Sequence, residues 1–127
     1  MKILIVDDSK FLRKAVSTLL KSRGYSVCEA ADGETAVTIA GQERPDVILL
    51  DMILPKLSGT DVLRRLRQDA STALIPVIML TGIGKDQELS AALAAGADRC
   101  LLKDNLQLTE VALALEQVAA GRSPLPV

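Results

Sequence analysis

The stretch DVILLDMILP, residues 46–55, places four consecutive apolar residues between two aspartates. An apolar run without alternation is typical of a parallel strand that is buried on both faces of its sheet. Similar runs stand at residues 2–6 (KILIV) and 76–80 (PVIML). These three stretches therefore predict the central strands of a parallel β-sheet.

Amphipathic stretches of helical length separate these runs, and further strands are predicted at residues 25–30 and 99–102. Strands that alternate with helices indicate an α/β fold with helices on both faces of a parallel sheet. We therefore expect a doubly wound, five-stranded parallel sheet, and we consider for it the strand order 2-1-3-4-5. The expected helices cover residues 10–23, 32–40, the segment around Val62, Leu63 and Leu66, 86–95 and 106–120.

The first and last helices show apolar stripes at the helical period. The first stripe comprises Phe11, Leu12, Ala15, Val16, Leu19 and Leu20, and the last comprises Leu108, Val111, Ala112, Leu115, Val118 and Ala119. Residues 1–120 are expected to form a single domain. Residues 121–127, which include two prolines, are expected to form a tail or the start of a linker.

Composition excludes several classes of function. The 15 basic and 16 acidic side chains give a net charge of −1, and only 2% of the 127 residues are aromatic, so neither a nucleic-acid electrostatic footprint nor a base-stacking surface is expected. The short N-terminal apolar run meets two aspartates at once, and no run approaches the roughly 20 residues of a membrane span. We therefore expect a cytoplasmic protein.

The sequence contains no histidine, which excludes histidine-dependent nucleophilic catalysis and imidazole metal ligands.

The two cysteines, Cys28 and Cys100, lack the paired spacing of zinc or redox motifs. The predicted strand order places them on opposite edges of the sheet, separated by four interstrand steps or roughly 19 Å. A disulfide needs Cα atoms within about 7 Å, so we expect two free thiols.

Polar side chains follow four of the predicted strands at the point where each strand ends. Asp7 and Asp8 follow the first strand, Asp51 the third, Thr81 the fourth and Lys103 the fifth. In a doubly wound sheet, ligands bind outside the carboxyl ends of the strands, and the order 2-1-3-4-5 makes these four strands neighbours. A single polar residue at a strand end marks only the end of burial. Five in this arrangement predict one shared pocket.

The residue types indicate the chemistry of this pocket. Three carboxylates a few ångströms apart repel one another unless their pKa values rise or a cation joins them. Oxygen ligands in a site open to phosphate favour Mg²⁺, with Mn²⁺ as an alternative. A lysine ammonium and a threonine hydroxyl suit the oxygens of a phosphoryl group. A carboxylate can accept that group covalently, and Asp51 lies between the acidic pair and the Thr81–Lys103 pair.

With these motifs, residues 1–120 resemble the receiver domain of two-component response regulators. The matching motifs are Ile5-Val6-Asp7-Asp8, Leu49 to Pro55, Ser58-Gly59, Met79-Leu80-Thr81-Gly82, Ala94 to Asp98 and Leu101-Leu102-Lys103. The resemblance implies a flavodoxin-like (βα)5 fold in which Asp51 accepts a phosphoryl group from a sensor histidine kinase or a phosphotransfer protein. It implies that Asp8, Asp51 and the backbone carbonyl of Ile53 hold Mg²⁺, with Asp7 acting mainly through a metal-bound water. Thr81 would follow the phosphoryl group, and Lys103 would pair with it.

The resemblance also implies a role. The domain would catalyse its own phosphorylation and dephosphorylation, and would act in signalling rather than as a turnover enzyme. The signal would pass by conformational change to a downstream target or a missing output domain, and phosphorylation could promote a dimer. The domain itself would contact neither nucleic acid nor membrane.

Three residues depart from the usual family pattern. Asp104 stands where a proline usually follows the lysine, so a trans or a strained peptide bond is expected there. Ser58 replaces an acidic residue before the loop glycine. Cys100 replaces the aromatic residue that changes rotamer on activation. Because a cysteine cannot act as a large bistable ring, we expect the response to phosphorylation in the loops at residues 81–85 and 103–105.

Other classes of protein fit the sequence less well. A receiver that no longer uses phosphate and acts as a constitutive docking surface is favoured by Cys100 and Asp104, and opposed by the intact Asp51, Thr81 and Lys103. A flavin carrier needs a Ser/Thr/Gly phosphate loop after the first strand, where the two aspartates would repel phosphate. A phosphatase of the haloacid dehalogenase type needs Asp-x-Asp at that point. A metal-dependent nuclease would need a basic groove.

Overall fold

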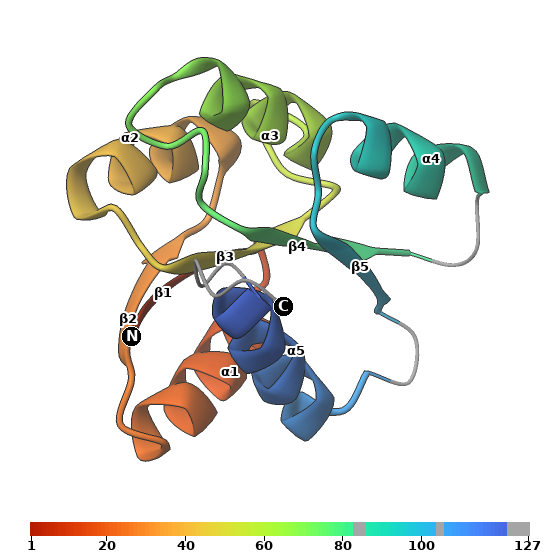
Figure 1. Cartoon of the computed structure of the whole chain (residues 1–127). Helices are drawn as coiled ribbons and strands as arrows, with labels where there is room; N and C mark the ends of the chain where they lie inside the picture. Colours follow the sequence, from red (N-terminus) through yellow and green to blue (C-terminus); the bar gives the residue numbers. More distant parts are fainter. Residues whose placement is uncertain (83–85, 104–105, 122–127) are drawn as a thin grey trace.

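The computed structural model describes residues 1–82, 86–103 and 106–121, without the side chains of residues 86–89. Strands and helices alternate along the chain (Figure 1). The strands are β1 (Lys2–Val6), β2 (Ser26–Ala30), β3 (Val47–Asp51), β4 (Val77–Thr81) and β5 (Arg99–Leu102). The helices are α1 (Lys10–Ser22), α2 (Gly33–Glu43), α3 (Gly59–Gln68), α4 (Asp86–Ala94) and α5 (Leu108–Gly121).

The strands form one parallel sheet in the order β2-β1-β3-β4-β5. Helices α2, α3 and α4 cover one face of this sheet, and α1 and α5 cover the other (Figure 1). Every residue of β3 and β4 is buried, as are residues 3–6 of β1. The predicted doubly wound sheet and its strand order are therefore confirmed.

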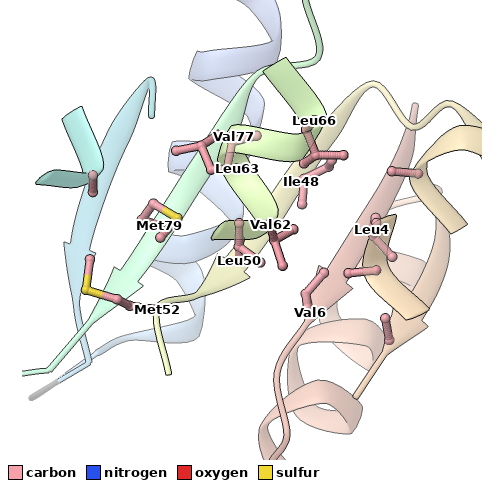
Figure 2. Packing of buried hydrophobic residues seen from close by; sticks show 14 residues of the cluster. Leu4, Val6, Ile48, Leu50, Met52, Val62, Leu63, Leu66, Val77 and Met79 are labelled. Atoms are coloured by element: carbon pink, nitrogen blue, oxygen red, sulfur yellow. The ribbon is translucent and has the colours of Figure 1, made fainter. Parts of the chain in front are cut away.

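Alternate residues of the inner strands enter two separate hydrophobic clusters. Under α2, α3 and α4, Leu4, Val6, Ile48, Leu50, Val77 and Met79 pack against Val62, Leu63 and Leu66 of α3 (Figure 2). On the opposite face, Ile3, Ile5, Leu49, Ile78 and Leu80 pack against Val16 and Leu20 of α1 and Val111 and Leu115 of α5. Both sets follow the period of two that a pleated strand imposes.

Three helices begin at a side chain that caps the first turn. Ser9 Oγ accepts from the Leu12 N–H at 3.2 Å, Asp32 Oδ1 from the Thr35 N–H at 2.8 Å, and Ser58 Oγ from the Asp61 N–H at 3.2 Å. Each cap satisfies a backbone donor that has no partner within its helix. Ser58, which departs from the usual family pattern, therefore serves as the N-cap of α3.

Several predicted boundaries move by one to three residues. Strands β3 and β4 each continue one residue further, because Met52 N–H donates to Leu80 O at 2.9 Å and Lys103 N–H to Thr81 O at 2.7 Å. Helix α2 runs to Glu43 and ends at Arg44, which adopts a left-handed φ of 46° before the proline. Helix α5 begins at Leu108 rather than at residue 106.

The predicted apolar stripes are wrong at three positions. Phe11 is 84% exposed and Leu108 is exposed, whereas Ala114, outside the predicted stripe, is buried. Phe11 precedes Leu12 by one residue, a rotation of about 100° round the helix. That rotation turns the ring away from the side of α1 that meets the sheet.

Other sequence predictions have mixed outcomes. Cys28 and Cys100 are free thiols on the two edge strands, as expected. No helix among the described residues is long and apolar enough to cross a membrane. Gly121 ends α5, and the rest of the predicted tail lies outside the described residues. So do residues 83–85 and 104–105 of the two loops expected to respond to phosphorylation, including the bond between Lys103 and Asp104.

Two glycine-to-alanine substitutions should have opposite effects on stability. A Cβ at Gly59 would collide with the carbonyl oxygen of Asp51 and lie 2.7 Å from Met52 Cα, so Gly59→Ala should destabilise the fold by about 1–3 kcal/mol. Gly41 lies inside α2 with nothing within 4 Å of an added Cβ, so Gly41→Ala should stabilise it by about 0.5–1 kcal/mol. Urea unfolding of both variants measures the two changes. A neutral Gly59→Ala would contradict the close packing of this loop on the end of β3.

Candidate functional site

Three carboxylates meet at the carboxyl edge of the sheet, as the sequence predicts. Asp7, Asp8 and Asp51 each offer a carboxylate oxygen, and these oxygens lie within 4.8 Å of one another. The neighbouring strands β1 and β3 carry them there, since Val6 and Leu50 are paired in the sheet and the acids follow directly. Asp7 and Asp51 are buried, whereas Asp8 is exposed. The cluster therefore has a buried floor and an open side.

Lys103, which follows the edge strand β5, contributes a positive charge to this cluster. Its Nζ lies 2.6 Å from Asp51 Oδ2 and 3.5 Å from Asp7 Oδ2. The backbone bond from Lys103 N–H to Thr81 O aims the side chain across the end of β4. One ammonium thus faces three carboxylates, and it is closest to Asp51.

Thr81 and Ile53 lie at the same edge with different contacts. Thr81 is buried, and its hydroxyl donates a long 3.5 Å hydrogen bond to Leu101 O on β5 rather than to a carboxylate. The Ile53 N–H donates to Asp51 Oδ1 at 3.3 Å, which places this peptide at the pocket, while its side chain is 72% exposed. The structure therefore brings every predicted site residue to one end of the sheet.

Burial and charge act in opposite directions on the ionisable groups. Burial raises the pKa of the Asp7 carboxyl, and the Asp51 charge adds to this, so that the N–H of Ser9 and the charge of Lys103 only partly compensate. Burial works to lower the pKa of Lys103, but its hydrogen bond to Asp51 and the charges of Asp51 and Asp7 together raise it. The folded chain therefore disfavours the negative charge on Asp7 and favours the positive charge on Lys103.

The donor set fits a hard divalent cation. Asp7 Oδ2 is buried and, among the described residues, has no hydrogen-bond partner. In the described part of the chain its one ion pair is to Lys103 Nζ at 3.5 Å, which Asp51 shares. A buried carboxylate oxygen that accepts no hydrogen bond is costly, so that a cation at this position would reduce the cost. Carboxylate oxygens with one open side are the ligands that Mg²⁺ prefers, because this ion keeps several waters.

Three residues that the sequence did not single out as part of the site also shape it. The Ser9 N–H donates to Asp7 Oδ1 at 2.8 Å, and Arg13 Nη1 donates to the Asp7 carbonyl oxygen at 2.7 Å. The Gly59 N–H donates to Met52 O at 2.8 Å and closes the loop against the end of β3. A serine directly before a predicted helix is a recognisable N-cap signal, so Ser9 could have been found from the sequence. Arg13 lies one helical turn after Ser9. The contact of Gly59 with Asp51 depends on tertiary packing.

Comparisons with known proteins agree with this geometry. A sequence profile of the response regulator receiver domain matches residues 3–115. The DNA-binding dual master transcriptional regulator RpaA of Synechocystis sp. is 44% identical over 102 residues, which cover 80% of this chain and 42% of that protein. The chain therefore spans less than half the length of this relative.

Solved structures are similar over nearly the whole chain. The receiver domain of the sensor histidine kinase PA1611 from Pseudomonas aeruginosa PAO1, with a magnesium ion coordinated in its active site cleft, has a TM-score of 0.84 and 31% identity, covering 94% of this chain and 97% of that one. The Vibrio cholerae chemotaxis protein CheY4 has a TM-score of 0.86 and 32% identity, covering 92% and 97%.

The raised pKa of Asp7 predicts that Asp7→Asn stabilises the protein in the absence of divalent cations. Folding disfavours the charged carboxylate, so the wild type loses stability relative to the variant as the pH rises from 3.8, the ordinary pKa, through the folded value. Urea unfolding between pH 3 and pH 7 should show a gain at neutral pH that disappears in acid.

Asp32→Asn provides a control of opposite sign. The N–H of Thr35 lowers the pKa of Asp32, so this carboxylate stabilises the fold above pH 3.8, and the variant should lose stability at neutral pH. If Asp7→Asn behaves like Asp32→Asn, the assignment of Asp7 as an unfavourably buried charge is wrong.

Proposed function

Because this chain belongs to the family of response regulator receiver domains of two-component systems, we propose that Asp51 accepts a phosphoryl group from a phosphohistidine of a sensor histidine kinase or phosphotransfer protein. The observation that carries this proposal is the ion pair of 2.6 Å between Lys103 Nζ and Asp51 Oδ2, beside the carboxylates of Asp7 and Asp8. Among the described residues, no other carboxylate of the cluster has a cation as close.

In the proposed reaction the phosphoryl group passes from an imidazole nitrogen of the donor to a carboxylate oxygen of Asp51. An oxygen of the Asp51 carboxylate forms a bond to phosphorus while the bond from phosphorus to the donor nitrogen breaks, and the electron pair of that bond leaves with the imidazole. Lys103 is already at this carboxylate and stabilises the negative charge that the phosphoryl group adds. The Thr81 hydroxyl donates a long bond to Leu101 O and can donate to a phosphoryl oxygen instead.

Asp7, Asp8 and Asp51, with the peptide of Ile53, would hold Mg²⁺. Receiver domains bind this ion at an acidic pocket, and when bound it offsets the charge of the carboxylates and of the incoming phosphoryl oxygens. The exposed Asp8 leaves the pocket open on the side from which a donor must arrive.

The proposed role is a switch rather than a turnover enzyme. The domain forms and hydrolyses its own acyl phosphate in the cytoplasm and passes the change to an output domain or a separate target protein. A cysteine occupies position 100, half-buried against the cluster under α2, α3 and α4. The rearrangement is therefore proposed to run through the loops that follow β4 and β5 rather than through an aromatic ring.

We propose that the donor protein contacts Phe11, near the start of α1. Phe11 follows Ser9, the cap of α1, by two residues and is 84% exposed. Together with Lys14, Ala15, Thr18 and Leu108 of α5 it lines one hollow on the face shared by α1 and α5. Helix α1 begins two residues after Asp8, and an exposed apolar side chain this close in sequence to the site suits contact with the protein that brings the phosphohistidine.

Intact-mass measurement after incubation with Mg²⁺ and acetyl phosphate tests the phosphoacceptor. The wild type should gain the mass of one phosphoryl group, and Asp51→Asn should gain none. Asp61→Asn, which removes an exposed carboxylate on α3, should behave as the wild type. An unmodified wild type would favour the docking module that does not use phosphate, and modification of Asp51→Asn would place the acceptor elsewhere.

Phe11→Ala should separate protein donors from small-molecule donors. With the autophosphorylated histidine kinase that transfers fastest to the wild type in a purified panel, the rate should fall roughly tenfold, equivalent to about 1.4 kcal/mol of lost contact. Phosphorylation by acetyl phosphate should be unchanged. Leu74→Ala, which removes another exposed apolar side chain, is the matched control. Equal rates for Phe11→Ala and wild type with the kinase would refute the docking surface.

A further inference from the structure

Arg13 links the acidic pocket to two secondary-structure elements that carry none of its carboxylates. From the first turn of α1, its Nη1 donates to the carbonyl oxygen of Asp7 at 2.7 Å. Its Nε forms an ion pair of 3.2 Å with Glu29 Oε1 on β2. The Arg13 side chain is only 16% exposed, and its bond to the Asp7 carbonyl is partly buried, whereas Glu29 is exposed. A guanidinium with a partner on each of two sides is favoured in one orientation.

The contact of Arg13 is with a peptide group and not with a carboxylate. The charges that shift the pKa of Asp7 are those of Asp51 and Lys103. The backbone of Asp7 is held by its N–H, which donates to Ala30 O at 3.1 Å, and by its carbonyl, which accepts from Arg13. The bond to Ala30 O constrains the peptide between Val6 and Asp7, and the bond from Arg13 constrains the following peptide, which joins Asp7 to Asp8.

The orientation of Asp8 depends on this peptide. Within the described part of the chain, the exposed Asp8 carboxylate makes no hydrogen bond or ion pair of its own. The backbone therefore sets the point and the direction in which the Asp8 side chain leaves the chain, and no other contact within the described residues holds it. The side chain of Asp7 is held separately, by the Ser9 N–H at 2.8 Å.

We propose that Arg13, held in place by Glu29, is a positioning residue that aims the Asp8 carboxylate at the cation site through the Asp7 carbonyl. This inference rests on the proposed Mg²⁺-dependent phosphorylation. It assigns to Glu29, on an outer strand, an indirect role in the site. Residues that orient metal ligands from behind typically change metal affinity 10–100-fold when they are removed.

Calorimetric titration with Mg²⁺ tests the proposal by the sign of the effect. If Arg13 acted as a nearby positive charge, its removal would tighten binding of a cation. If it positions Asp8, Arg13→Ala should weaken binding at least about tenfold. Lys10→Ala removes an exposed positive charge one turn earlier on the same helix and should leave the Mg²⁺ affinity unchanged or slightly tighter. Affinity in Arg13→Ala equal to or tighter than in the wild type overturns the proposal.

A double-mutant cycle tests the role of Glu29. Glu29→Ala should weaken Mg²⁺ binding in the wild-type background and have no further effect in Arg13→Ala, because it acts through Arg13. An equal loss in both backgrounds would show a direct charge effect and exclude Glu29 from the proposal. Arg13→Lys, which keeps the charge and one donor, should bind Mg²⁺ with intermediate affinity and remains informative if Arg13→Ala does not fold.

Thermal unfolding separates positioning from a merely structural role. A structural Arg13 would lower the melting temperature of Arg13→Lys and leave its Mg²⁺ dissociation constant unchanged, which would overturn the inference. A wild type that binds no Mg²⁺ would instead refute the proposed metal site itself, so the two failures are distinguishable.

Discussion

The burial of β1, β3 and β4 on both faces is the constraint on which the rest of the structure depends. Their side chains alternate between two hydrophobic clusters, and neither face is open to water. Backbone groups inside such a sheet are satisfied only by the neighbouring strands, so the order and register are strongly constrained. Polar groups can enter only where the strands end. This is why Asp7, Asp51 and Thr81 are buried and yet reachable from one edge.

The same burial creates an electrostatic conflict at that edge. One ammonium at 2.6 Å from Asp51 and 3.5 Å from Asp7 partly offsets three carboxylates, and Asp7 Oδ2 has no hydrogen-bond partner among the described residues. The raised pKa of Asp7 is the measure of the remaining cost. Such a cost is expected at a site that is complete only when a cation and an anionic group join it.

The side chains of α1 point in different directions and contact different parts of the molecule. Ser9 caps the helix, Arg13 reaches back to the Asp7 carbonyl, and Val16 and Leu20 fill the core beneath the sheet. Phe11 leaves toward solvent on the face that α1 shares with α5. A helix turns about 100° per residue, so nearby residues of one helix can contact the acidic pocket, the core and the solvent.

The sequence by itself determined the α/β class and the strand ends at which the polar residues gather, because unbroken apolar runs leave a strand few alternatives to burial. The strand order is decided by the packed sheet, in which β1, β3, β4 and β5 are neighbours. Tertiary structure decided which members of an apolar stripe are buried, and here Phe11, Leu108 and Ala114 depart from the pattern. It also decided that Lys103 contacts Asp51 more closely than Asp7 and that Arg13 binds a carbonyl rather than a carboxylate. Periodicity specifies the face on which a side chain lies. Contacts between residues distant in sequence depend on the three-dimensional packing of strands and helices, which no local pattern encodes.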